Sequence, residues 1–135
     1  MAVFALTSVT TTIDSNDLTA NLKSSTLAVD AAQLDSTDFD SAGWTEMIGG
    51  LKGGTLSLEF NDDVANGSVD DLLWAMLGTV VSFTVKPTSA AVGTSNPSYS
   101  GNVLITAHAL GGSVGDLAGK SLTFPVTGAV TRATS

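Results

Sequence analysis

The stretch TLSLEFNDDVANGSVDDLLWAMLG (residues 55–78) changes its apolar period halfway along, and this change indicates two kinds of element. Over residues 55–60 the apolar Leu56, Leu58 and Phe60 alternate with polar residues. A period of two is typical of a strand that rests one face on a core. The first half of the stretch therefore predicts a half-buried strand.

The second half of the stretch has the period of an α-helix. Its apolar residues fall at i, i+3, i+4, i+7 and i+8, which form one stripe on a helix. The residues of this stripe are Val69, Leu72, Leu73, Met76 and Leu77. Ser68 is placed to cap the start, two aspartates follow in the first turn, and Gly78 is placed to end the helix. We predict a short helix over about 69–77 that packs this stripe on a sheet, because so short a helix is unstable alone.

The segments on either side of this stretch are rich in Val, Thr and Leu, which suit pleated strands. Strand-like patterns occupy residues 4–13, 21–30, 44–48, 79–86, 103–109 and 121–130. Since the apolar residues of 103–109 lie on one side, His108 on the other side is expected to face solvent or an interface. Pro125 cannot donate a ladder hydrogen bond, so the last strand is expected to be an edge strand or to carry a bulge there.

The 135 residues are predicted to form one domain, 1–135, in which two long connections stand out. The first covers about 31–50 and holds three Asp residues, and the second covers about 87–100 and is rich in Ser, Gly and Pro. Loops longer than about 12 residues are uncommon in compact domains and are often functional. We therefore expect these two loops to do more than connect strands.

Composition favours a β-rich domain whose surface is polar but carries few charges. Ser and Thr supply 34 of the 135 residues, whereas charged residues make up only 13%. The 13 acidic and 5 basic side chains give a net charge of −8. Nucleic acids and anionic membranes are bound mainly through Lys and Arg, so both are disfavoured as docking partners.

Cellular location has only weak signals in the sequence. Cysteine is absent, which favours folding in a reducing cytoplasm. Residues 1–13 contain no basic side chain, so no signal peptide is expected. The longest apolar stretch, 72–85, has 14 residues and is broken by polar ones, whereas a membrane span needs about 20.

No catalytic, cofactor or metal site is expected. Residues 115–121 (GDLAGKS) resemble a phosphate-binding loop, but they have one residue too few between the glycines and precede a strand instead of a helix. Residues 62–73 resemble a calcium loop, but Val64 and Leu73 stand where two ligands should be. The single histidine, His108, comes with no signature of a nucleophile and an orienting group.

The first long connection carries candidates for self-association. They are Asp38, Phe39, Trp44, Met47, Ile48 and Leu51. Trp and Met are enriched at protein interfaces. The alternative interpretation is that Trp44, Met47, Ile48 and Leu51 form a minor core patch beneath the loop.

Two parts of the chain carry a resemblance to a known family. LDSTDFDSAGWTEMIGGLKGGTLSLEF (34–60), followed by the acidic turn and the short helix, resembles the major tail tube subunit of long-tailed, siphovirus-like bacteriophages. NPSYSGNVLITAHALGGSVGDLAGKSLTFPVTGAV (96–130) resembles the closing strands of the same family. The resemblance covers roughly residues 1–132.

The resemblance implies a β-sandwich, close to a closed barrel, with one helix on its flank. It implies hexameric rings that join edge to edge and stack into a tube, with the loop near 31–50 reaching the neighbouring ring. The tube would conduct DNA without binding it specifically and would meet a tape measure protein and tail-end proteins. It would belong to the virion tail and assemble in the host cytoplasm, without a cofactor. The same fold also builds the type VI secretion tube and tail adaptors, so fold alone does not fix the role.

The main hypothesis is therefore a structural subunit without enzyme activity. The runner-up is an immunoglobulin-like binding or capsid-decoration module, which composition fits almost as well. A third possibility, a small β-rich hydrolase, lacks a nucleophile–base pair. For the tube, we expect a net negative lumen, because repeated phosphate contacts would act as a brake on DNA. A channel lined by most of Lys23, Lys52, Lys86, Lys120 and Arg132 would contradict this expectation.

Overall fold

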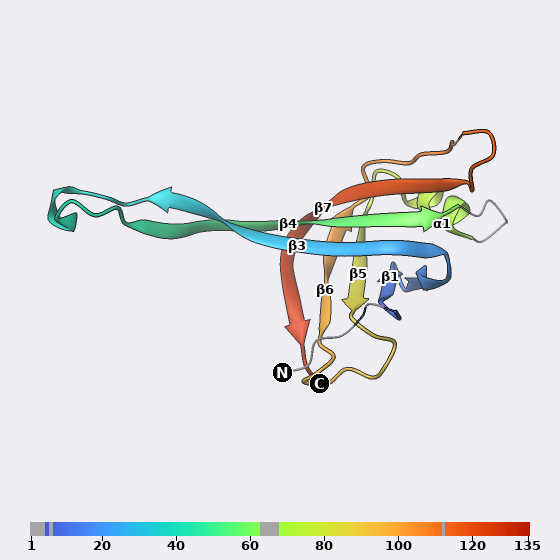
Figure 1. The fold of residues 1–135 in the computed structure, drawn as a ribbon, viewed down its shortest axis with the longest axis horizontal. Coiled ribbons are helices and arrows are strands. Elements are labelled where there is room, and N and C mark those ends of the chain that lie inside the picture. The colour runs from blue at the N-terminus through green and yellow to red at the C-terminus, as the bar shows by residue number, and fades with distance from the viewer. Residues whose placement is uncertain (1–4, 6, 63–67, 112) are drawn as a thin grey trace.

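The computed structural model of the chain describes residues 5, 7–62, 68–111 and 113–135 (Figure 1). Within these residues every strand pairing is antiparallel, and the strand order is β2-β1-β5-β6-β7-β4-β3. The elements are β1 (Thr10–Ile13), β2 (Asn16–Asp17), β3 (Leu22–Asp35), β4 (Met47–Asn61), α1 (Val69–Met76), β5 (Val80–Lys86), β6 (Ser98–Leu104) and β7 (Gly119–Ala133). Short 3₁₀ turns span Thr19–Asn21 and Phe39–Ser41. The predicted class, mainly β with one short helix, is confirmed.

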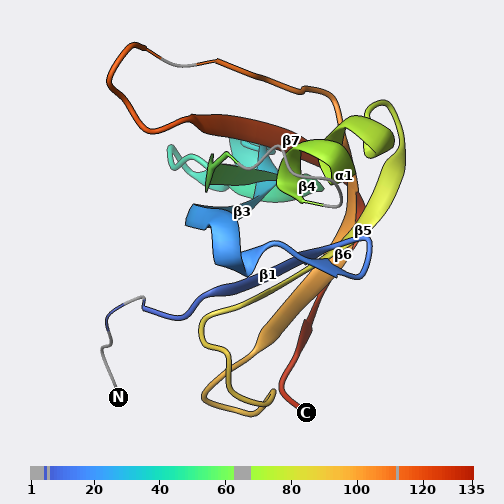
Figure 2. The ribbon, with the colours of Figure 1, turned by 90° about the vertical axis from the view of Figure 1, so that its right-hand side faces the viewer.

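Strand β7 belongs to both layers of the fold. Its residues 119–125 pair with β4, and from Val126 onward it pairs with β6. A register shift against β6 and a left-handed Gly128, with φ of 80°, accompany the bend that Figure 1 shows in this strand. One layer is therefore β7-β4-β3 and the other is β2-β1-β5-β6-β7, as Figure 2 shows from the end.

Pro125 lies where β7 changes partner. It forms the last pair with β4, opposite Thr55. The expectation of an edge strand holds locally, because each residue of β7 has a partner on one side only, β4 up to Pro125 and β6 from Val126 onward. The irregularity of the strand lies beyond Pro125, at Gly128. Proline's missing N–H is tolerated here because the strand is leaving one ladder for another.

The core fills the space between the two layers. The alternation predicted for residues 55–60 is confirmed, since Leu56, Leu58 and Phe60 are buried. Apolar side chains from both layers and from the helix meet them. These are Ile13, Leu18, Val69, Leu73, Met76, Phe83, Val103, Ile105, Leu122 and Phe124.

The predicted helix is present as α1, at the end of the body away from the long hairpin in Figure 1. Val69, Leu73 and Met76 are buried, and Leu72 packs against the core at partial exposure. The placement of Leu77 in the stripe is wrong: the helix ends at Met76, and Leu77 is 40% exposed at its C-cap. Among the described residues, no helix is long and apolar enough to cross a membrane.

The ends of the helix follow the prediction in part. Gly78 has a φ of +83°, as expected of a glycine that ends a helix. Ser68 occupies the N-cap position, but its side chain makes no capping hydrogen bond. Residues 63–67 of the stretch compared with a calcium loop, Val64 among them, lie outside the described residues.

The first long loop is the largest correction to the sequence analysis. The expected loop over 31–50 is strand at both of its ends, because β3 and β4 pair as far as Asp35 opposite Met47. Only residues 36–46 form the connection. The sequence hid this hairpin because pairs of Ala or Gly at residues 31–32, 49–50 and 53–54 interrupt the apolar alternation of its two strands.

Other boundaries also differ from the prediction. The second loop covers 87–97, because β6 begins at Ser98. The strand expected over 103–109 ends at Leu104, and residues 105–118 form a third long connection that the sequence analysis missed. Strand β1 begins at Thr10 instead of residue 4, which lies outside the described residues, and the strand expected over 44–48 begins at Met47.

Candidate self-association surface

The long β3–β4 hairpin projects from the body, and we call residues 29–54 the arm (Figure 1). Beyond the pair Thr55–Pro125, β4 has β3 as its only partner among the described residues. The arm is therefore a two-stranded ribbon that extends roughly 25 Å by strand rise before its connecting turn. Such a ribbon is marginally stable by itself in water, so it gains most when another surface covers it.

The tip of the arm, residues 36–46, is held by local hydrogen bonds. The Asp38 carboxylate accepts hydrogen bonds from the Asp40 N–H at 3.0 Å and from the Ser41 hydroxyl at 3.2 Å. Across the base of the tip, the Glu46 N–H donates to the Thr37 hydroxyl at 2.8 Å. These bonds fix the tip in one shape, which lowers the entropy lost when it binds a partner.

Apolar side chains of the arm face solvent. All six predicted self-association residues lie on it, five of them apolar and exposed. Their exposed fractions are Phe39 108%, Trp44 77%, Met47 48%, Ile48 56% and Leu51 89%. The sixth, Asp38, shapes the tip through its hydrogen bonds. The interpretation of this group as a core patch is wrong for the isolated chain, because none of its apolar members is buried.

The sequence analysis missed two further members of this surface. Val29 and Leu34 of β3 are 53% and 49% exposed, and Leu34 pairs with Ile48 across the ribbon. Val29 continues an alternation that begins at Leu27, whereas Leu34 falls out of phase with it, beyond a register shift between Ala31 and Gln33. Exposed apolar side chains gathered in this number on one projecting hairpin indicate a site of interaction.

Glycine allows the two strands of the arm to approach closely at Gly54. A Cβ atom built there would lie 2.5 Å from the Ala28 carbonyl oxygen. At Gly53, by contrast, a Cβ would meet nothing within 4 Å. Packing within the arm therefore requires glycine at position 54 but not at position 53.

The clearest group of titratable side chains lies beneath α1 and is built around Lys120. The Lys120 ammonium is 3.3 Å from the Asp62 carboxylate and 2.9 Å from the Asp70 carboxylate, and its side chain is fully buried. The Lys120 hydrogen bond is the main reason that the pKa of Asp70 lies below its usual value. Sequence reasoning missed this residue, although its alternation with Leu122 and Phe124 placed it on the inward face.

His108 joins the same group, so of its two expected positions, toward solvent or toward an interface, the first is wrong. Its side chain is 12% exposed, and its Nε2 lies 3.1 Å from the Asp70 carboxylate. Its ring packs edge-on against Trp74 at 5.3 Å between centroids. Among the described residues Nδ1 has no hydrogen-bond partner, which is not the arrangement of a base held between a nucleophile and an orienting group. The group ties the 105–118 connection, α1 and β7 together.

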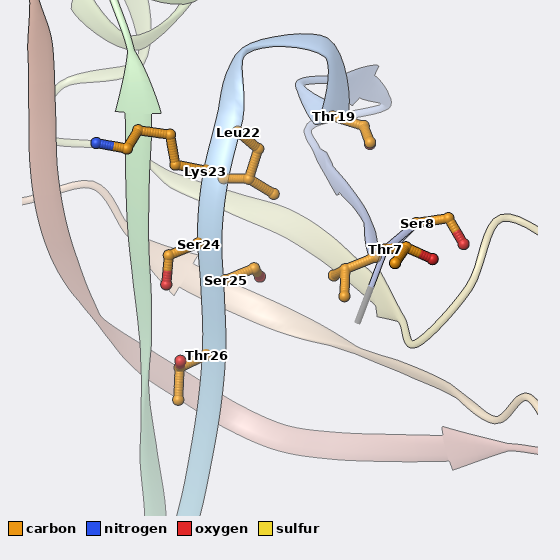
Figure 3. A pocket seen from close by; sticks show the side chains of 9 residues that line it. Thr7, Ser8, Thr19, Leu22, Lys23, Ser24, Ser25 and Thr26 are labelled. Atoms are coloured by element: carbon orange, nitrogen blue, oxygen red, sulfur yellow. The ribbon is translucent and has the colours of Figure 1, made fainter. Parts of the chain in front are cut away.

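A cavity of about 300 Å³ lies where β1 and β3, toward opposite ends of the strand order, come near each other without pairing (Figure 3). It lies between the N-terminal segment and β3, and one hydroxyl contact crosses nearby, from Thr11 to Ser25 at 2.9 Å. Hydroxyl side chains and one lysine line most of it, namely Thr7, Ser8, Thr19, Lys23, Ser24, Ser25 and Thr26. Among the described residues that line the cavity there is no carboxylate or imidazole that could form an acid–base pair.

Comparison with solved structures identifies the fold as one found in virion tails. The chain is similar to a chain of the virion of a native gene transfer agent particle, with a TM-score of 0.74 and 20% identity over 93% of this chain and 95% of that one. It is also similar to a chain of the tail of an empty gene transfer agent particle with C6 symmetry, with a TM-score of 0.68 and 20% identity over 87% of each chain. No protein-family model and no curated protein matches the sequence.

Proposed function

We propose that this protein is a structural subunit that assembles into stacked hexameric rings and forms the tail tube of a phage-like particle. The observation that carries the proposal is the likeness of its fold, over most of the chain, to a chain from a tail with C6 symmetry. In this role the protein belongs to the virion tail, acts without catalysis and conducts DNA during ejection.

The exposed arm supports self-assembly. A single chain that forms rings and stacks must use different surfaces on its two sides, so that each copy offers one surface and receives another. The arm offers an apolar surface and unpaired strand edges well away from the body (Figure 1). Exposed edges of this kind are a hazard in a monomer but serve as pairing sites in a polymer.

The charge of the chain suits a conduit for DNA. The net charge is −8, and one of the five basic side chains, Lys120, is buried between carboxylates and cannot reach a lumen. DNA could then pass with few phosphate contacts to slow it. In the complete tail the tube would also meet a tape measure protein inside it and tail-end proteins at its ends.

Electron microscopy of the purified protein tests the proposal directly. We expect negative-stain images to show six-fold rings or tubes as concentration rises. A protein that stays monomeric or trimeric at all concentrations would contradict the proposal and favour the binding or capsid-decoration module. A tube structure with most of the exposed basic side chains, Lys23, Lys52, Lys86 and Arg132, facing the channel would contradict the proposed negative lumen.

A further inference from the structure

An apolar groove of about 360 Å³ lies at the end of β5 farthest from α1. It is lined by Leu27 and Val29 of β3, Val85 and Pro87 at the end of β5, and Tyr99 of β6. Val29 is 53% exposed, and the other lining residues are partly exposed. An apolar hollow of this size, open to solvent, gains stability when a side chain of a partner fills it.

A cation stands beside this groove. Arg132 lies opposite Tyr99 in the β6–β7 ladder, its Nε donates to the Tyr99 hydroxyl at 3.1 Å, and its guanidinium lies 5.9 Å from the centre of the Tyr99 ring. Within the described part of the chain, Arg132 forms no ion pair with a carboxylate. The groove therefore combines apolar walls with an arginine whose charge is not neutralised, which is a frequent composition of binding hot spots.

The tip of the arm has the complementary composition. Phe39 and Trp44 expose their rings, and Asp40 and Glu46 lie beside them with exposed carboxylates. Neither carboxylate forms an ion pair with a described cation. The tip is thus a fixed turn that presents aromatic rings flanked by negative charge.

We infer that the arm tip of one copy docks in the groove of a second copy, with an aromatic ring of the tip against Tyr99 and its carboxylates near Arg132. The tip lies at the far end of the arm from its own body, so the contact is between copies (Figure 1). Because donor and receiver are different surfaces, the contact repeats from copy to copy. The inference rests on the proposed function, since it identifies the surface that receives the arm when copies stack.

Disulfide cross-linking tests this contact, and the absence of cysteine from the chain makes the test clean. The variant Thr45→Cys/Pro87→Cys places one thiol beside Trp44 and one in the groove, and both anchors, Trp44 and Tyr99, remain. After assembly and mild oxidation we expect a ladder of covalent multimers that a reducing agent collapses. The matched control, Thr45→Cys/Lys23→Cys, places the second thiol at the other end of β3 and should remain monomeric on the gel.

Charge reversal gives an independent readout. Arg132→Glu should raise the concentration needed for assembly at least tenfold, whereas the same change at another exposed cation, Lys23→Glu, should leave it within about twofold. Adding Asp40→Lys and Glu46→Lys to Arg132→Glu restores opposite charges on the two surfaces and should recover assembly. Circular dichroism of each monomer checks that the variants are folded.

The outcomes separate this inference from the proposed function. If the wild-type chain never assembles, both fail. If tubes form while the Thr45→Cys/Pro87→Cys variant yields no ladder, or while Arg132→Glu assembles like the wild type, the groove receives something other than the arm. The inference is then overturned, and the proposed function stands.

Discussion

Replacing Lys120 by Met tests whether the charged group beneath α1 stabilises the fold. Lys120 and Asp62 have side chains that are 0% and 1% exposed, with 3.3 Å between ammonium and carboxylate. At that separation two unit charges attract by about 5 kcal/mol if the effective dielectric constant is about 20. Methionine keeps the length of the side chain but removes the charge, so a buried carboxylate loses its cation.

The expected loss is about 3–5 kcal/mol in the free energy of unfolding, which is typical when one partner of a buried pair is removed. In a domain of this size that corresponds to a fall in Tm of roughly 10–15 °C. Urea titration of the unassembled monomer at pH 7 measures the change. Lys23→Met is the matched control, and because Lys23 is exposed it should stay within about 0.5 kcal/mol of wild type.

The pH dependence gives the prediction a second readout. The pKa of Asp70 is held below its usual value of 3.8, chiefly by the Lys120 hydrogen bond, so the folded state is favoured at pH values above that range. This contribution is lost as the pH falls through the lowered pKa. The gap in stability between wild type and Lys120→Met should therefore be widest near neutral pH and narrow in acid.

Two results would refute the reasoning. The first is a Lys120→Met variant whose free energy of unfolding lies within about 1 kcal/mol of wild type at pH 7. That result would mean that the desolvation penalty of the buried charges equals the free energy of their attraction. The second is a gap that stays constant into acid. The triple variant Lys120→Met/Asp62→Asn/Asp70→Asn, which removes the charges of Lys120 and of both its carboxylate partners, should recover much of the loss.

The remaining predictions concern the helix, the arm tip and the arm glycines. Leu73→Asp should unfold the monomer, because Leu73 is 0% exposed and a charge in the core is costly; a folded variant by circular dichroism would contradict the packing of α1. Trp44→Asp or Ile48→Asp should abolish assembly in electron micrographs yet leave monomer stability within about 0.5 kcal/mol; persistent tubes would show that the arm is not a contact. Gly54→Ala should destabilise the chain by about 1–3 kcal/mol in urea titration, while Gly53→Ala should be nearly neutral; equal effects would contradict the close approach at Gly54.

The sequence predicted the elements whose signal is local. The alternation around Leu58 and the helical stripe at Val69, Leu73 and Met76 reflect burial within one element, and the structure confirms both. The same reasoning overextended the helix by one residue at Leu77, because a periodic pattern does not say where the backbone leaves the helix.

The elements that the sequence did not predict depend on residues far apart in the chain. The arm forms because β3 and β4 pair along their whole lengths, and its Gly and Ala residues have weak preferences of their own. His108 is turned inward by Asp70 and Trp74, which a strand-alternation argument could not foresee because the strand ends at Leu104. The residues of the candidate surface were largely identified, but the extended shape that presents them was not.

The shared strand β7 has a mechanical consequence for a protein built to stack. Strand β4 runs from the arm into the body, where its residues 55–61 are paired with residues 119–125 of β7. Antiparallel ladder hydrogen bonds lie perpendicular to the strands, so a pull along the arm loads this whole ladder in shear at once instead of peeling it open one bond at a time. The load then continues along the β7 backbone into the second layer. Tension on the arm is therefore carried through the body without requiring the two layers to separate.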